Sequence, residues 1–127
     1  MTATALVTVF ALIEYMWIAF SVGQARGQYG VAAPATTGNE VFERWFRVQQ
    51  NTLEQLVVFL PALWLFALYV NGRLAALIGL GFVAGRYLYA RGYVEDAEKR
   101  GRGFLVGFIA TALLLAGALL GALWRIL

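Results

Sequence analysis

The sequence predicts an all-α fold, a left-handed antiparallel four-helix bundle that is an integral membrane protein. Hydrophobic residues make up 61% of the 127 residues and charged residues 13%, against about 45–50% and about 25% in soluble domains. The mean hydropathy is +0.72. Four apolar segments of roughly 20 residues, the length that crosses a bilayer, are separated by short polar stretches, so consecutive helices should run antiparallel.

The four helices are predicted within one domain, 1–127, at residues 3–25, 41–70, 73–94 and 103–125. The first has no basic leader and is interrupted by Glu14, so we interpret it as a retained membrane helix rather than a signal peptide. A loop rich in turn formers precedes the second helix, which should kink at Pro61, and Asn71-Gly72 forms the next turn. Small residues in the later helices predict close packing: Gly79, Gly81, Gly85, Gly117 and Gly121.

Glu14 is a carboxylate inside an otherwise apolar segment. Such carboxylates are costly in a membrane, so they usually face protein or water and often mark functional sites. Two interpretations remain open. Glu14 takes part in function, or it is a protonated or hydrogen-bonded residue at a contact between helices.

The chain contains no cysteine and no histidine. It therefore has no disulfide, no thiolate nucleophile, no imidazole base and no Cys/His metal site, and no metal cofactor is expected. The net charge of +3 is too small and too localised for nucleic-acid binding. Any nucleophile that acts near neutral pH must then come from a ligand.

Basic residues are concentrated in two of the three polar connections. The first connection and its flanks carry Arg26, Arg44 and Arg47, and the third carries Arg86, Arg91, Lys99, Arg100 and Arg102, whereas the opposite side has only Arg73 and Arg125. Positively charged loops tend to remain in the cytoplasm. We therefore expect a multi-pass protein whose polar loops and active site face the cytoplasm and whose termini lie on the far side.

Two polar stripes are expected to meet at that surface. They are formed by residues that share one helix face, namely Arg47, Asn51 and Glu54 on the second helix and Arg86, Tyr89 and Tyr93 on the third. Arg100 joins them if the third helix continues, and Arg26 lies near by. Guanidiniums bind carboxylates, a carboxylate pairs with an ammonium, and an amide binds a peptide group. Glutathione carries all of these groups, so it is the ligand that the set indicates.

The other basic residues near helix ends are interpreted as anchors to lipid headgroups, since long basic side chains reach the membrane surface from there. They are Arg44, Arg91, Lys99 and Arg102. The same explanation is weaker for the two stripes, because Glu and Asn have no reason to accompany a headgroup anchor.

Three motifs resemble those of the MAPEG family, the membrane-associated proteins of eicosanoid and glutathione metabolism. FERWFRVQQNTLEQ is similar to the family's helix-two signature, ARGQYGVAAPATTG to its first loop and GRYLYARGY to its helix-three motif. The resemblance implies a homotrimer that binds glutathione between adjacent subunits near the cytoplasmic face. It implies that Arg100 lies beside the thiol and that the contacts are Arg26, Arg47, Gln49, Asn51, Glu54, Arg86, Tyr89 and Tyr93.

A guanidinium beside sulfur favours the thiolate, so Arg100 is the expected catalytic residue. The leading hypothesis is a membrane-bound glutathione transferase that conjugates glutathione to lipophilic electrophiles, with reduction of lipid hydroperoxides as a further activity. The expected partners are glutathione as co-substrate, a lipophilic electrophile or lipid hydroperoxide, and membrane lipids.

Two other functions remain as alternatives. A non-enzymatic lipid-binding adaptor of the same family is disfavoured because this chain keeps both Arg47 and Arg100. A small multi-pass carrier is disfavoured because its polar groups should lie at mid-membrane, where only Glu14 is found. Two positions depart from the family pattern: Gln55 replaces a tyrosine that contacts glutathione, and Gly27 replaces a second consecutive arginine of one member, which argues against that member's particular chemistry.

Overall fold

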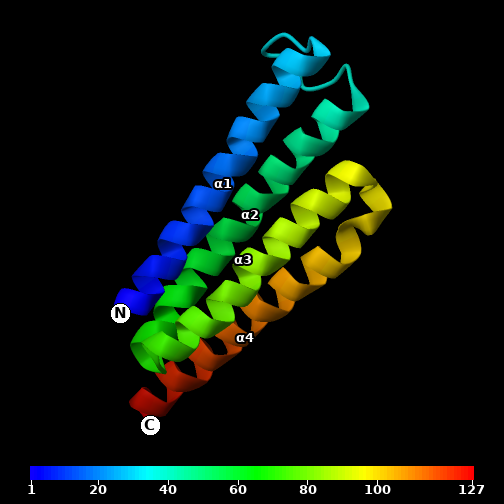
Figure 1. Cartoon of the computed structure of the whole chain (residues 1–127). Helices are drawn as coiled ribbons and strands as arrows, with labels where there is room; N and C mark the ends of the chain where they lie inside the picture. The colour runs from blue at the N-terminus through cyan, green and yellow to red at the C-terminus, as the bar shows by residue number, and fades with distance from the viewer.

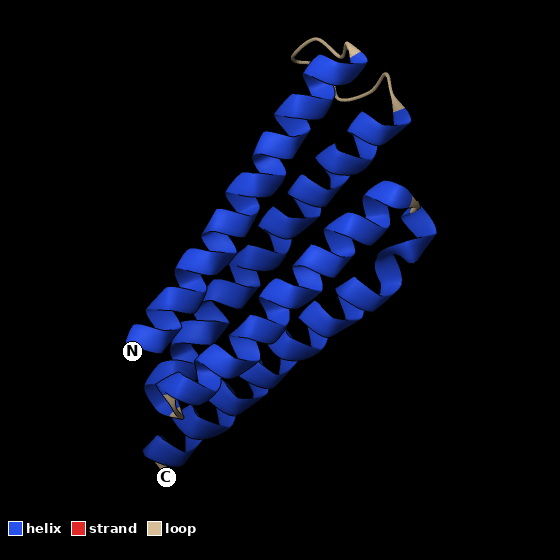
Figure 2. Cartoon of the chain, in the orientation of Figure 1, coloured by secondary structure: helices blue, strands red, loops and turns tan.

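The computed structural model covers every residue, Met1–Leu127, and contains four long α-helices, one short 3₁₀ helix and no strand (Figure 1, Figure 2). In chain order the elements are α1 (Thr2–Tyr29), α2 (Glu40–Tyr69), α3 (Gly72–Glu95), η1 (Ala97–Arg100) and α4 (Gly101–Ile126). The predicted all-α class with four helices is confirmed.

The helices alternate in direction, and α2 and α3 form the centre of the bundle. Both α1 and α4 pack against α2 and α3. The connections 30–39 and 96–100 lie at one end of the bundle, called the loop end below, and both termini lie at the other (Figure 1). Both polar connections therefore lie on one side of the bundle, opposite the termini, as the charge distribution predicted.

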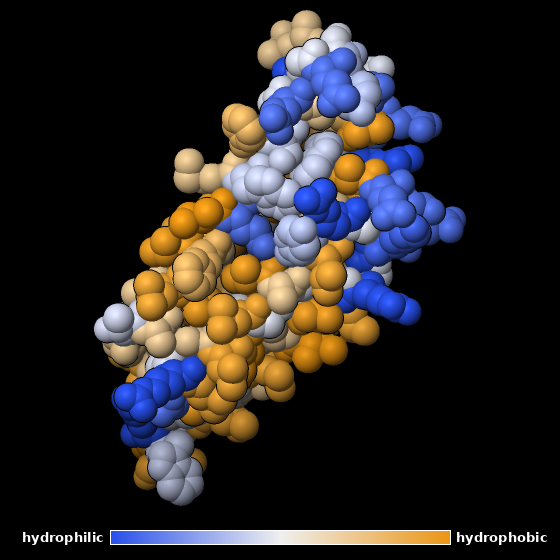
Figure 3. All heavy atoms as spheres, viewed as in Figure 1, coloured by the Kyte–Doolittle hydropathy of each residue, from blue (hydrophilic) through white to orange (hydrophobic).

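The surface is divided into polar and apolar zones along the bundle. Hydrophilic side chains gather at the loop end, whereas hydrophobic side chains cover the middle (Figure 3). Three segments are long and apolar enough to cross a membrane, namely Thr2–Tyr29, Glu40–Tyr69 and Ala97–Ile126. The remaining helix, α3, carries several charged residues among its glycines, but with 24 residues it is about 36 Å long and lies alongside the others.

Asparagine side chains start two of the helices. Asn39 Oδ1 accepts hydrogen bonds from the backbone N–H groups of Val41 (2.9 Å) and Phe42 (3.1 Å). Asn71 Oδ1 accepts one from the N–H of Leu74 (2.9 Å). These N–H groups have no partner within the helix. The chain therefore breaks between α2 and α3 at the first residue of the predicted turn.

The first helix continues past its predicted end at residue 25. Gly30 ends it in the left-handed conformation (φ 67°), which glycine adopts at little cost. The N–H of Val31 donates to the carbonyl of Arg26 at 3.0 Å. Arg26, which the sequence placed beyond the first helix, therefore lies in the last turn of α1.

The third helix does not continue to Arg100. It ends at Glu95, and Asp96 takes an extended conformation (φ −157°, ψ 122°). The Asp96 side chain then accepts a hydrogen bond from the N–H of Glu98 (3.1 Å) and starts η1. Because η1 turns the chain back, the Arg100 guanidinium carbon still lies 5.9 Å from the centroid of the Tyr93 ring. The two side chains meet across a chain reversal rather than along one helix.

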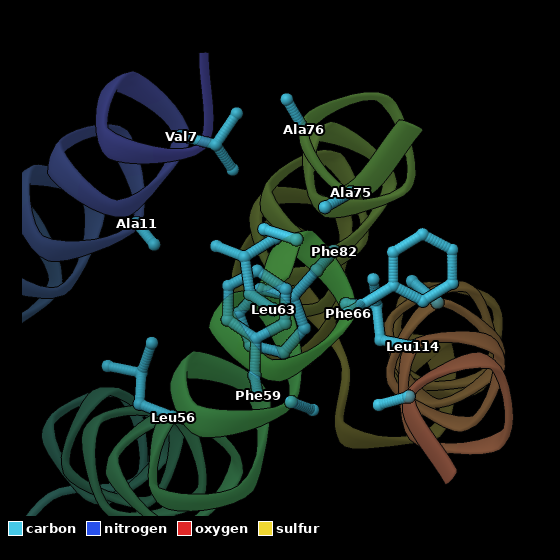
Figure 4. Close-up of a cluster of buried hydrophobic side chains, with 14 residues drawn as sticks. Val7, Ala11, Leu56, Phe59, Leu63, Phe66, Ala75, Ala76, Phe82 and Leu114 are labelled. Carbon is cyan, nitrogen blue, oxygen red and sulfur yellow. The ribbon is translucent and has the colours of Figure 1, made fainter. Parts of the chain in front are cut away.

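One large cluster of buried hydrophobic side chains joins all four helices (Figure 4). The rings of Phe59 and Phe82 stack at its centre, with centroids 3.7 Å apart and planes 5° apart. Val7 of α1 and Leu114 of α4 close the cluster from opposite sides (Figure 4). Because lipid is as apolar as these side chains, tight van der Waals packing stabilises the bundle more than removal from solvent does.

Glycines allow α3 and α4 to approach backbone to backbone. A Cβ on Gly103 would overlap the backbone of Tyr89 and lie 2.7 Å from the carbonyl oxygen of Gly85. A Cβ on Gly85 would lie 2.7 Å from the backbone nitrogen of Gly107. The close packing predicted at Gly85 is present, and it holds the start of α4 against the end of α3.

Gly103→Ala should therefore destabilise the bundle by roughly 1–3 kcal/mol, the usual cost of adding a methyl group to a packed contact. The measurement is the midpoint of thermal unfolding in detergent, followed by circular dichroism. Gly101→Ala is the matched control, because a Cβ there meets nothing within 4 Å and the residue is already helical (φ −60°, ψ −45°). Equal midpoints for the two variants would contradict the backbone contact.

Candidate functional site

Arg86 lies at the centre of a buried polar cluster between α2 and α3. The residue is only 1% exposed. Its Nη2 donates hydrogen bonds to Asn51 Oδ1 at 2.9 Å and to Thr52 Oγ1 at 2.8 Å. Its guanidinium carbon lies 4.1 Å from the centroid of the Tyr89 ring. A buried cation needs such partners, so these four residues, the Arg86 cluster below, hold one another in place.

Glu14 approaches the Arg86 cluster from α1. It lies on the buried stripe of that helix, between Ala11 and Ile18, which are 1% and 0% exposed. Ile18, one turn further along α1, packs with Tyr89 and Ala90 of α3, so Glu14 lies level with Arg86. Arg86 Nε is buried without a hydrogen-bond partner. The structure thus places Glu14 at a contact between helices rather than toward lipid.

Two tyrosines connect the Arg86 cluster to the loop end. The centroids of the Tyr89 and Tyr93 rings are 5.6 Å apart, and Arg100 lies over the Tyr93 ring. The guanidiniums of Arg47, Arg86 and Arg100 are all within electrostatic range of the Tyr89 phenol. A buried guanidinium, two phenols and an exposed guanidinium therefore follow one another from Arg86 to the loop end.

A pocket of about 280 Å³ opens beside Tyr93 at the loop end. It is lined by Thr36, Glu43, Arg44, Phe46, Arg47 and Tyr93, and we call it the rim pocket. Arg47 is exposed and Tyr93 half-buried, so both side chains can be reached by a ligand. Because Arg100 lies over the Tyr93 ring, it brings a further guanidinium close to the rim pocket. No group of three or more His, Cys, Asp or Glu side chains is placed to bind a metal ion.

Arg44 does not act as the lipid anchor that the sequence indicated. Its Nη1 donates hydrogen bonds to the carbonyl oxygens of Val94 (3.1 Å) and Glu95 (3.3 Å) at the end of α3. It also forms an ion pair with Glu40 at 3.7 Å. The last carbonyl groups of a helix have no partner within it, so Arg44 caps α3 from α2. The headgroup interpretation is wrong for Arg44, because its guanidinium is directed to the neighbouring helix.

Arg26 stabilises the first connection through hydrogen bonds. Its Nη1 donates to the carbonyl oxygens of Ala35 (2.7 Å) and Val31 (3.3 Å). Its guanidinium carbon lies 4.6 Å from the centroid of the Phe42 ring on α2. Arg26 lines a separate hollow of about 510 Å³ with neighbouring residues of the connection. It is not part of the rim pocket.

The predicted site residues fall on two sides of α2. Arg47 and Asn51 lie on the side of the rim pocket and the Arg86 cluster, and the exposed Glu54 follows on the same face. Successive helix residues are about 100° apart, so Gln49 points roughly 160° away from both Arg47 and Asn51. Gln49 instead shares its face with Phe42, the residue that Arg26 contacts.

Within one chain, Arg47 and Tyr93 therefore lie at the rim pocket, and Asn51, Arg86 and Tyr89 lie in the Arg86 cluster beside it. Arg26 and Gln49 lie apart from both. Sequence reasoning missed Thr52 and Thr36. A hydroxyl beside Asn51 on a buried helix face was an available signal for Thr52. Thr36 lies in a connection that has no helical period, so no pattern marked it.

Comparison with known proteins agrees with the family resemblance of the three sequence motifs. The model of the MAPEG family matches residues 4–120. The uncharacterized protein sll1147 of Synechocystis is 52% identical over 96% of this chain and 89% of its own length. Microsomal glutathione S-transferase 2 of Homo sapiens is 42% identical over 94% and 79%, and leukotriene C4 synthase of Cavia porcellus is 36% identical over 94% and 79%.

Thr52→Val should cost roughly 1–3 kcal/mol of unfolding free energy, because it removes an acceptor from the buried Arg86 guanidinium and leaves that donor unpaired. The measurement is again thermal unfolding in detergent. Thr111→Val is the matched control: Thr111 is also buried, but its hydroxyl bonds only to the carbonyl of Gly107 within its own helix. If the two variants lose the same stability, Thr52 is not a specific partner of Arg86.

Proposed function

This chain belongs to the MAPEG family of integral membrane proteins, and from that membership we propose that it is a glutathione transferase. It activates the thiol of glutathione for conjugation to lipophilic electrophiles that dissolve in the bilayer. The observation that carries the proposal is the convergence of Arg47, Tyr93 and Arg100 at the loop end. Two exposed guanidiniums beside a phenol suit a ligand that carries two carboxylates and an ionisable thiol.

Different residues bind different groups of glutathione. Arg47 pairs with a carboxylate of glutathione, the exposed Glu54 pairs with its ammonium, and the Arg86 cluster supports the peptide part through Asn51 and Tyr89. Arg100 lies beside the sulfur. A neighbouring guanidinium stabilises the thiolate relative to the thiol, whose pKa is otherwise about 8.5. The thiol proton leaves to water, and the thiolate forms a carbon–sulfur bond as the electrophile's bond to its leaving group breaks.

The division of residues over α2 supports a site shared between copies. Arg26 and Gln49 lie on the opposite side of α2 from Arg47 and Asn51, and a helix with its side chains is about 10 Å wide. A single tripeptide contacts both sets most directly when they come from two chains. We therefore propose a homotrimer in which each glutathione lies between adjacent subunits.

Reduction of lipid hydroperoxides is part of the same proposal. The thiolate attacks the terminal peroxide oxygen, the O–O bond breaks, and the lipid alkoxide takes up a proton to become an alcohol. A second glutathione then reduces the resulting sulfenic acid and gives the disulfide and water. The reaction needs the same thiolate beside Arg100 and no metal.

The loop end is proposed to face the cytoplasm. Apart from the buried Arg86, every basic residue except Arg73 and Arg125 lies at or near this end, in the pattern that the positive-inside rule describes. The glutathione site then opens to the compartment from which a polar tripeptide is supplied, while acceptors enter from the bilayer.

Mixing the purified protein with glutathione should produce the ultraviolet absorbance of a thiolate, and Arg100→Ala should remove it without dissociating the oligomer. Arg102→Ala is the control, because Arg102 is exposed in the first turn of α4 and outside the proposed site. A wild-type protein with no saturable glutathione site would contradict the transferase and favour a lipid-binding adaptor. Equal absorbance in wild type and Arg100→Ala would contradict the role of Arg100.

The orientation can be tested because the chain has no cysteine. A single cysteine at Thr37, in the first connection, should react with a membrane-impermeant maleimide only after the membrane is opened. A single cysteine at Leu127, beyond α4, should react in intact cells. The opposite labelling pattern would place the glutathione site on the outer side.

A further inference from the structure

Glu14 is a carboxylate within a membrane-spanning helix that the proposed reaction does not use. Its position is defined by its neighbours on α1, since Ala11 and Ile18 on either side of it are both buried among α2 and α3. A side chain at this register is directed into the bundle. Glu14 therefore faces protein at the depth of Arg86.

The counterpart of Glu14 is a guanidinium that is incompletely satisfied. Arg86 uses Nη2 for Asn51 and Thr52, but its Nε is buried and unpaired. The chain's two direct ion pairs lie elsewhere, at the loop end. Ile18, one turn along α1, packs with Tyr89 and Ala90 of α3, so the Glu14 carboxyl group lies level with Arg86 and faces it across a gap rather than in a direct contact.

Arg86 contacts two residues of the proposed glutathione site, Asn51 and Tyr89. Asn51 is kept in one orientation because Oδ1 accepts from Nη2, so its amide nitrogen points away from Arg86. The Tyr89 ring is held under the guanidinium at 4.1 Å, and Tyr93 packs against Tyr89. A shift of Arg86 would therefore move both the amide and the tyrosines.

We propose that Glu14 is a positioning residue for glutathione, whose carboxyl group holds Arg86 against Asn51 and Tyr89 and so shapes the buried side of the binding site. The inference rests on the proposed function. Without this carboxyl group, Arg86 is a buried cation with no acidic side chain facing it, and it turns toward water or the lipid surface. Asn51 and Tyr89 then lose their support. Arg100 lies beyond Tyr93 and is untouched, so thiolate formation continues once glutathione is bound.

The test is steady-state kinetics of Glu14→Gln with glutathione as the varied substrate and a soluble aryl halide as the acceptor. The KM for glutathione should rise about five- to ten-fold, within the range for residues of one network. The kcat and the thiolate absorbance at saturating glutathione should stay within about two-fold of wild type. Glu14→Asp keeps the carboxyl group on a shorter side chain and should give a smaller rise, about two- to three-fold.

Thr4→Val is the control for a merely structural role. Thr4 is a buried polar residue of the same α1 stripe, but its hydroxyl bonds to the carbonyl of Gly72 at the other end of the bundle. Its loss should lower the unfolding midpoint and leave the KM for glutathione unchanged.

The outcomes separate the two proposals. If the wild type shows no saturable glutathione binding, the proposed function fails. If the wild type binds glutathione and Glu14→Gln has the wild-type KM, or loses only thermal stability as Thr4→Val does, the role of Glu14 is overturned. If Glu14→Gln does not fold, Glu14→Asp decides in its place, since a wild-type KM in that variant also overturns the inference.

Discussion

The burial of one guanidinium inside the helix bundle is the constraint on which the rest of the site depends. Arg86 is 1% exposed, and a cation at that depth is tolerated only if surrounding groups compensate it. Asn51 and Thr52 of α2 supply hydrogen-bond acceptors, Tyr89 supplies a ring face, and Glu14 of α1 faces the cluster from the neighbouring helix. Three helices are thereby tied together at one level, directly below the loop end.

From Arg86, the proposed site extends toward the surface along the side chains of α3. The tilted rings of Tyr89 and Tyr93 follow one another toward the loop end, and η1 then folds back so that Arg100 meets Tyr93. The return is possible because glycines let α4 start against the backbone of α3. The lack of a side chain at Gly103 therefore bears on the proposed function, since it sets where Arg100 can lie.

The sequence allowed the fold class and the members of the two stripes to be predicted, because apolar segment length and helical spacing are local properties. Arg47 with Asn51, and Arg86 with Tyr89, follow from such spacing alone. Contacts between distant segments were not predictable in this way. The capping of α3 by Arg44, the approach of Glu14 to Arg86 and the reversal that brings Arg100 to Tyr93 all depend on tertiary packing. Arg26 was misplaced because α1 continues past residue 25 and ends only at Gly30.

The predicted residues lie on two sides of α2. The central claim that follows is that one glutathione is held between two copies of the chain. The most direct measurement is an experimental structure of the protein in lipid nanodiscs with glutathione bound. The account predicts the sulfur beside Arg100, with Arg47 and Tyr93 from the same subunit and Arg26 and Gln49 from its neighbour. Glutathione held entirely within one subunit, or bound away from the rim pocket with Arg100 turned toward lipid, would contradict it.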